Sequence, residues 1–129
     1  MSPTITALYA GLLGIIYLVL AGRVVAERRR ARVGLGTGGD AALERAVRVH
    51  GNFAEYTPIF LLLLLVAELN GAATLLLHAL GAVFVLARIG HAQGLSQRSG
   101  VSRGRFMGTL ASWVALLVLA LANLWLAFT

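Results

Sequence analysis

The sequence predicts an all-α integral membrane protein, a four-helix bundle formed by a single domain over residues 1–129. Hydrophobic residues make up 59% of the chain and charged residues only 12%, whereas soluble domains carry about a quarter charged residues. The hydrophobic residues are gathered into four long stretches. This composition excludes a soluble enzyme and a disordered chain, because disorder requires low hydrophobicity and high charge. With no cysteine in the chain, disulfides, thiolate metal sites and cysteine nucleophiles are excluded as well.

The first two predicted spans cover residues 4–26 and 44–69. The first carries one charge, Arg23, near its end, and at about 1.5 Å per residue it is roughly 34 Å long, enough to cross a bilayer with some tilt. The second is wholly apolar from Ile59 to Ala67 and has a polar half before that stretch, and we interpret both halves as one helix. Asp40 is its expected N-cap, because a side-chain oxygen there accepts a hydrogen bond from the first helical turn.

The third and fourth predicted spans, residues 72–91 and 106–128, are apolar all round, as expected of helices buried in lipid or in a bundle. Small residues recur at a spacing that lets helices approach closely: Ala7 and Gly11, Gly90 and Gly94, and the series Gly104, Gly108 and Ser112. Glu68 lies near the end of the second span, where we predict an interfacial charge.

The basic residues set the predicted orientation. All eleven are arginine, and five of them fall between Arg23 and Arg32. Four crossings place the basic loops 27–43 and 92–105 on one side, which the positive-inside rule assigns to the cytoplasm, and both termini on the opposite side. Anionic membrane lipid is the expected partner of the arginine run 28–32. We expect no nucleic acid partner, because no stacking aromatic residues lie among the arginines.

The polar half of the second span is the most informative segment. At 100° per residue, five polar side chains fall within about 100° of arc: Arg45, Arg48, Asn52, Glu55 and Tyr56. His50 lies on the opposite side of the same helix. Because an intramembrane charge costs at least ~2.5–3.5 kcal/mol, these groups must face one another, a cavity or a partner helix. One interpretation is an Arg48–Glu55 salt bridge that only fixes packing, and the other is a polar ligand site.

The chemistry of a ligand site on this stripe follows from its side chains. Arginine binds carboxylates through paired hydrogen bonds, and an amide such as Asn52 pairs with a peptide group. A carboxylate such as Glu55 binds an ammonium group or orients an arginine. Such a site suits a small zwitterionic peptide with excess negative charge. A thiol in that peptide would ionise more readily beside arginine.

The string from Glu44 to Pro58, ERAVRVHGNFAEYTP, strongly resembles the MAPEG family of membrane-associated proteins in eicosanoid and glutathione metabolism. The stretch 87–94, ARIGHAQG, and the basic start of the fourth span are similar to the family too. The resemblance covers essentially the whole chain. The family includes microsomal glutathione transferases, prostaglandin E synthase and the cysteinyl-leukotriene synthase.

The resemblance implies a homotrimer of four-helix subunits, with the cosubstrate glutathione bound between neighbouring subunits near the cytoplasmic face. By similarity, glutathione is held by Arg48, Asn52, Glu55 and Tyr56 of one subunit, by His50 of the next, by Arg23, Arg28 or Arg29 at the end of the first helix, and by His91. Either Arg103 or Arg105 stabilises the thiolate. Leu95 stands where eukaryotic members usually have a second tyrosine, and no serine follows either arginine. These differences argue against the specific eicosanoid reactions but not against a glutathione pocket.

We therefore expect a membrane-bound glutathione transferase or peroxidase that acts on lipophilic electrophiles, in a bacterial inner membrane. The alternative is a non-catalytic protein of the same fold, structural or a small transporter. A third interpretation is a basic membrane anchor that acts through residues 23–32. We predict no metal site, because His78 and His91 lie about 20 Å apart along one helix and no zinc-binding spacing is present.

Overall fold

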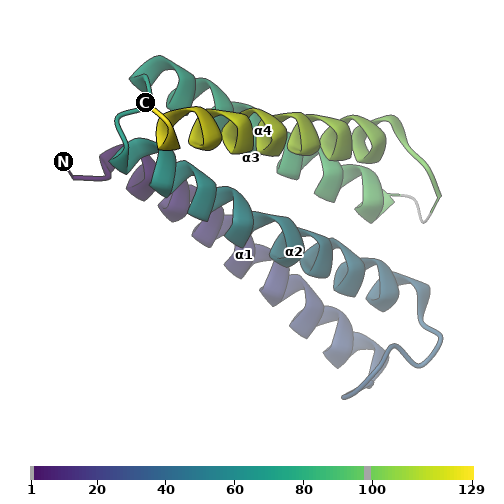
Figure 1. Ribbon diagram of the computed structural model, residues 1–129. Coiled ribbons are helices and arrows are strands. Elements are labelled where there is room, and N and C mark those ends of the chain that lie inside the picture. The colour runs from purple at the N-terminus through teal and green to yellow at the C-terminus, as the bar shows by residue number, and fades with distance from the viewer. Residues whose placement is uncertain (1, 98–99) are drawn as a thin grey trace.

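The computed structural model describes residues 2–97 and 100–129 and contains four helices in that part of the chain. These are α1 (Thr4–Ala31), α2 (Ala41–Leu69), α3 (Thr74–Gln97) and α4 (Arg103–Ala127), shown in Figure 1. Each helix is long and apolar enough to cross a membrane. No strand occurs among the described residues. The prediction of an all-α protein with four spans is confirmed.

The helices extend past the predicted spans at the end where the two longer loops lie. α1 continues to Ala31 instead of residue 26, α2 begins at Ala41 and not at 44, α3 reaches Gln97, and α4 begins at Arg103. Hydropathy marks the hydrocarbon core, whereas a helix continues into the interface while its backbone hydrogen bonds are satisfied. In α1 the last turn also carries Arg28, Arg29 and Arg30, and cations there interact favourably with the helix dipole.

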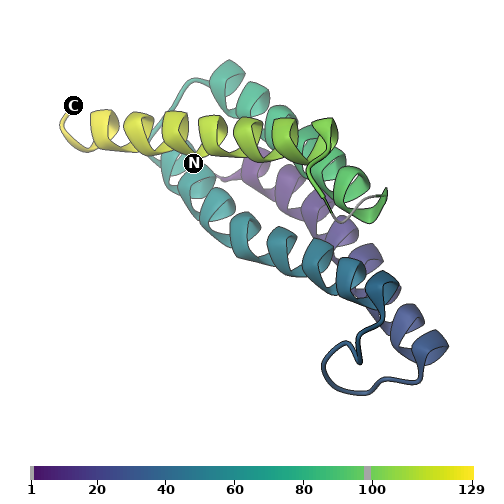
Figure 2. The same cartoon turned by 90° about the vertical axis from the view of Figure 1, so that its right-hand side faces the viewer.

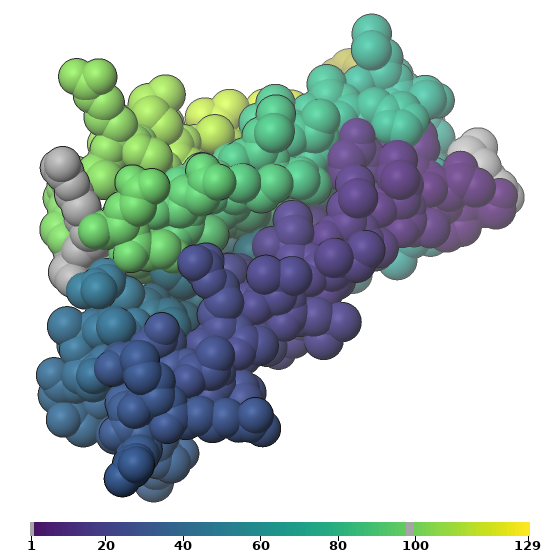
Figure 3. Space-filling model, turned by 180° about the vertical axis from the view of Figure 1, so that it is seen from behind, coloured from purple at the N-terminus to yellow at the C-terminus, as the bar shows by residue number. Residues whose placement is uncertain are grey.

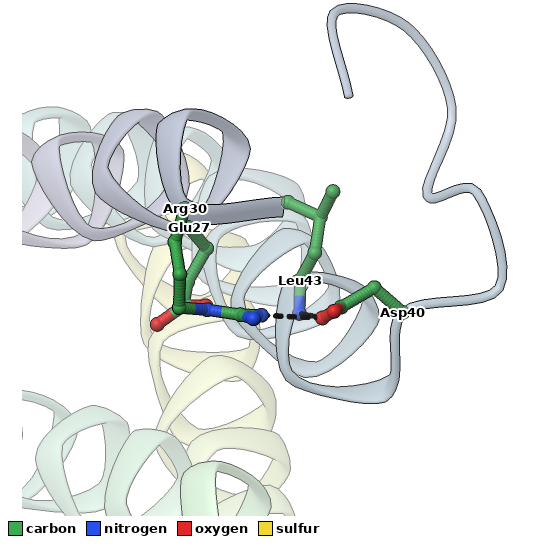
Figure 4. A network of polar contacts seen from close by, with 4 residues as sticks. All are labelled: Glu27, Arg30, Asp40 and Leu43. Atoms are coloured by element: carbon green, nitrogen blue, oxygen red, sulfur yellow. Dashed lines mark hydrogen bonds and ion pairs between the residues drawn. The ribbon is translucent and has the colours of Figure 1, made fainter. Parts of the chain in front are cut away.

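The start of α2 is capped as predicted, and the cap also joins α2 to α1. Asp40 Oδ1 accepts a hydrogen bond from the Leu43 N–H at 2.9 Å and one from Arg30 Nη2 at 2.6 Å. Arg30 Nε donates to Glu27 at 2.6 Å, which completes the chain of contacts in Figure 4. The Leu43 N–H and then the Arg30 guanidinium lower the pKa of Asp40. Three charged groups are thus paired with one another outside the bundle.

The helices pack as two pairs, α1 with α2 and α3 with α4, and the pairs diverge toward the longer loops (Figure 1). Within the described residues α1 makes no contact with α4. The α2 and α3 helices join the pairs through Phe60 and Phe84, whose rings stack 3.8 Å apart. Both chain ends and the short α2–α3 turn lie away from the longer loops, as Figure 2 also shows.

Glycine permits the closest approach between α3 and α4. A Cβ on Gly94 would lie 2.5 Å from the Arg105 nitrogen, and a Cβ on Gly108 would lie 2.5 Å from the Ala87 oxygen. The predicted close contacts of these small residues are therefore confirmed. Gly11 differs, because nothing lies within 4 Å of a Cβ built there, and its spacing from Ala7 produces no contact inside this chain.

The prediction that Glu68 is an interfacial charge is wrong. Glu68 is buried, with 5% of its surface exposed. Its two carboxylate oxygens accept hydrogen bonds from the N–H groups of Ile5 at 2.8 Å and Thr6 at 2.7 Å. The start of α1 has no side-chain cap of its own, so a carboxylate from α2 satisfies these exposed backbone donors. Its burial could not be predicted from the sequence, because its hydrogen-bond partners lie more than 60 residues away.

Candidate functional site

A polar cavity of about 190 Å³ lies between α2, α3 and α4, toward the longer loops. It is lined by Ala41, Glu44, Arg45, Arg48, Asn52, His91, Leu95 and Arg105. Four of the predicted site residues are therefore brought together by three different helices: Arg48, Asn52, His91 and Arg105. The close glycine contact of α3 with α4 lets the start of α4 reach this cavity, because Gly94 lies against the Arg105 backbone.

Arg88 of α3 lies beside this cavity and is 1% exposed. Its Nη2 donates to Asn52 Oδ1 at 2.8 Å, and its guanidinium carbon lies 5.1 Å from the centroid of the Tyr56 ring. Its Nε and Nη1 are buried and have no hydrogen-bond partner in the described part of the chain. Arg88 is not among the predicted site residues, and the prediction that the third span is apolar all round is wrong at this position. The signal that identifies it is its place as the charged residue within an otherwise apolar span.

The predicted pairing of Arg48 with Glu55 is present but weak. Arg48 Nη1 lies 3.5 Å from Glu55 Oε1, and both side chains are more than half exposed. Gly51 lies between them, and a Cβ there would be 3.4 Å from Arg48 Nη1. At about 1.5 Å per residue, Glu55 is roughly 21 Å from the Leu69 end of α2, near the middle of the helix. Exposed charges at this depth call for a further partner.

Tyr56 links the polar cavity to the outer face of α4. Its ring packs near the Arg88 guanidinium, and its hydroxyl accepts a hydrogen bond from Trp113 Nε1 at 2.9 Å. Trp113 is 57% exposed, and Leu110 and Val114 beside it are exposed as well. One side of the site is therefore charged and the adjoining side is apolar.

The remaining predicted residues lie elsewhere in this chain. His50 packs on Tyr17 of α1, with ring centroids 4.8 Å apart. Arg28 Nη1 donates to the Gly36 oxygen at 2.8 Å, Arg29 is exposed, and Arg23 lines a different cavity. A single chain does not bring these residues to the polar cavity.

The structure separates the two arginines at the start of α4. Arg105 is half-buried and lines the polar cavity together with His91. Arg103 is exposed and lies in a shallow groove with Val101 and Phe106. Their separation follows from the helical turn, since residues two apart project about 200° apart on a helix. Arg105 is therefore positioned to reach a ligand in the cavity.

The charge balance of the cavity is strongly positive. Arg45, Arg48, Arg88 and Arg105 lie in or beside it, against the carboxylates of Glu44 and Glu55. Burying a guanidinium without compensation is costly, so the arrangement favours an anionic ligand with several acceptor oxygens. The described residues contain no group of three or more side chains that would hold a metal ion.

Comparison with known proteins gives a family and two similar bacterial proteins. The MAPEG family model matches residues 6–125. The chain is 41% identical over 121 residues to "Inner membrane protein YecN" of Escherichia coli K12 and equally to the protein of that name from Escherichia coli O6:H1. Each alignment covers 94% of this chain and 91% of the relative.

Proposed function

This chain belongs to the MAPEG family, and we propose that it is a glutathione-dependent enzyme that acts on lipophilic electrophiles. Its four spans and its relatives make it an inner membrane protein. The proposal concerns the reaction, which is transfer of glutathione to the electrophile or reduction of a hydroperoxide. The polar cavity between α2, α3 and α4 is its proposed active site.

The observation that carries this proposal is the excess of arginine around Arg88, whose buried Nε and Nη1 have no hydrogen-bond partner among the described residues. Glutathione carries two carboxylates and one ammonium group, so its net charge is negative and opposite in sign to the excess positive charge of the cavity. Arginine forks hold carboxylates, and Glu55 accepts the ammonium group. Because Arg88 donates to Asn52 Oδ1, the Asn52 amide nitrogen is left to donate to a peptide carbonyl of the ligand.

Arg105 supplies the proposed chemistry. A guanidinium beside the sulfur favours the thiolate over the thiol, and the thiolate is the nucleophile. In the transfer reaction this sulfur forms a bond to the electrophilic carbon, and the leaving group departs with its bonding electrons. The electrophile arrives from the bilayer along the exposed face of α4, where Trp113 meets Tyr56.

A homotrimer would complete this site. Arg48 and Glu55 are more than half exposed near the middle of α2, and a neighbouring subunit would shield them from lipid. The neighbour would also contribute His50 and one of Arg23, Arg28 and Arg29, which the single chain places outside the cavity. The oligomer and the ligand are thus parts of one proposal.

A non-catalytic protein of the same fold is the second candidate. It is favoured by the internal contacts of the cavity, since Arg88 already bonds to Asn52 and Tyr56 already bonds to Trp113. A polar network of this kind can serve only to fix helix packing. The two candidates differ in whether the cavity takes up glutathione.

Glutathione binding to the detergent-purified protein decides between them. We expect binding together with ultraviolet absorbance of the thiolate, and loss of both in Arg48→Ala and Asn52→Ala. Arg32→Gln is the matched control, because it removes an exposed arginine charge outside the cavity. No binding to the wild type at millimolar glutathione, or equal loss in the control, would contradict the enzyme proposal.

A further inference from the structure

A second cavity, of about 220 Å³, lies between α1, α2 and the end of α3. It is lined by Leu20, Arg23, Ala26, Glu27, Ala42, Arg45, Ala46, Val49 and Ser96. Arg45 is the residue shared with the polar cavity described above. Figure 3 shows this side of the molecule, where part of α2 is visible between the C-terminal half of α1 and the end of α3.

The Glu27 carboxylate, which lines this cavity, is already paired with Arg30, which is not among the lining residues. Glu27 Oε2 accepts a hydrogen bond from Arg30 Nε at 2.6 Å, and Arg30 is held in turn by Asp40 (Figure 4). The Glu27 carboxylate therefore pairs with Arg30 and not with Arg23. In the described part of the chain, Arg23 has neither a hydrogen bond nor an ion pair. Among the described residues, the Arg23 guanidinium therefore faces this cavity without an ion pair of its own.

The depth of this cavity matches the phosphate level of a bilayer. At about 1.5 Å per residue, Arg23 is roughly 29 Å along α1 from Thr4, and Arg45 is roughly 36 Å along α2 from Leu69. A hydrocarbon core is about 30 Å thick, so both guanidinium groups reach the headgroup region on the side of the basic loops. Leu20, Ala46 and Val49 form an apolar wall next to them.

We propose that this cavity binds a phosphate group, held by Arg23 and Arg45 with the Ser96 hydroxyl as a further donor. Arginine is suited to this ligand because its fork matches two phosphate oxygens. The apolar wall and the depth favour the phosphodiester of an anionic lipid headgroup as the source, as in other basic pockets between membrane helices. This cavity shares Arg45 with the polar cavity, and Arg23 is one of three arginines proposed above to reach a neighbour's glutathione. Lipid binding does not depend on the proposed enzyme activity, because it requires neither Asn52 nor Arg105.

The test measures binding of dioctanoyl-phosphatidylglycerol to the detergent-purified full chain by native mass spectrometry. Dioctanoyl-phosphatidylcholine and inorganic phosphate are the comparison ligands. We expect the double variant Arg23→Gln/Arg45→Gln to weaken phosphatidylglycerol binding by about tenfold or more, as for loss of charge-assisted hydrogen bonds. Arg32→Gln, which removes an exposed charge outside the cavity, should weaken it much less than the double variant does, because Arg32 offers only general attraction to an anionic lipid.

Further variants keep the outcome decisive. If the double variant folds poorly, Arg23→Lys is the variant to use in its place. It preserves the positive charge, so most of the lipid binding should remain. Asn52→Ala should retain phosphatidylglycerol binding even if it loses glutathione, which separates this proposal from the proposed function. If inorganic phosphate also binds and the double variant weakens its binding, the cavity is a phosphate site. The ligand is then free phosphate and not the lipid headgroup. Lipid binding that Arg32→Gln weakens as much as the double variant does would overturn the proposal.

Discussion

The two charged residues that are buried among the described residues, Glu68 and Arg88, lie toward opposite ends of the bundle. Glu68 receives a backbone N–H donor on each carboxylate oxygen. Arg88 donates to Asn52, and two of its buried nitrogens have no partner in the part of the chain that the structure describes. The two residues are therefore similarly buried but differ in how many of their polar atoms have hydrogen-bond partners.

Under the proposed function, this difference separates a structural charge from a ligand-binding one. A buried polar group that has its partners stabilises the fold, whereas one that lacks them costs free energy until a ligand arrives. Glu68 fastens α1 to α2, and its removal should affect folding. Arg88 has unused donors next to a cavity, and its removal should affect ligand binding.

The largest effect is expected for Arg88→Met. This change removes the donor to Asn52 and the cation beside Tyr56, and we expect glutathione affinity to fall by about 100-fold, as for loss of a hydrogen bond to a charged group. The thermal midpoint without ligand should stay the same or rise, because an apolar side chain replaces an incompletely paired charge. Calorimetric titration and melting in detergent measure both. A large fall in stability would mean that Arg88 is structural.

Glu68→Ala should give the reverse pattern. Loss of the carboxylate leaves the N–H groups of Ile5 and Thr6 without acceptors, and we expect a loss of about 1–3 kcal/mol in the free energy of unfolding. Glutathione affinity of the folded protein should be unchanged. Denaturation followed by circular dichroism checks the first expectation and calorimetry the second. Unchanged stability would mean that Glu68 does not stabilise the fold.

Gly94→Ala should produce a mixed effect, because this residue supports both packing and the site. Its new Cβ would lie 2.5 Å from the Arg105 nitrogen, so α4 must shift, at a cost of about 1–3 kcal/mol. The displaced Arg105 should also weaken glutathione binding several-fold. Gly11→Ala is the matched control, since its Cβ meets nothing within 4 Å and alanine favours the helix. Similar behaviour of the two variants would contradict the close contact.

The smallest effect is expected at Asp40, a paired charge near the basic loops. Its folded-state pKa is lowered by the Leu43 N–H and by Arg30, so its stabilising contribution is present above the unfolded-state pKa of about 3.9. It is lost as the pH falls through the lower folded-state pKa. Wild type should therefore melt slightly above Asp40→Asn at pH 6, and the difference should vanish in strong acid. A difference that grew on acidification would have the wrong sign.

The sequence by itself determined the four spans, the Asp40 cap and the polar stripe of α2. Each depends on local information, because hydropathy, capping and helical periodicity are properties of consecutive residues. The Arg48–Glu55 contact is also local, since both residues lie on one helix. The small-residue spacing identified Gly94 and Gly108 as contact residues but also identified Gly11, where an added Cβ would meet no described atom within 4 Å.

The tertiary structure decided which of these groups meet. Asn52 and Arg88 are 36 residues apart, and Glu68 and Thr6 are 62 apart, so no local pattern pairs them. The choice of Arg105 over Arg103 for the polar cavity likewise depended on how α4 rotates against α3. The physical reason is that a helix sequence defines its own polar and apolar faces, whereas the face that it turns to a neighbour depends on packing summed over the whole bundle.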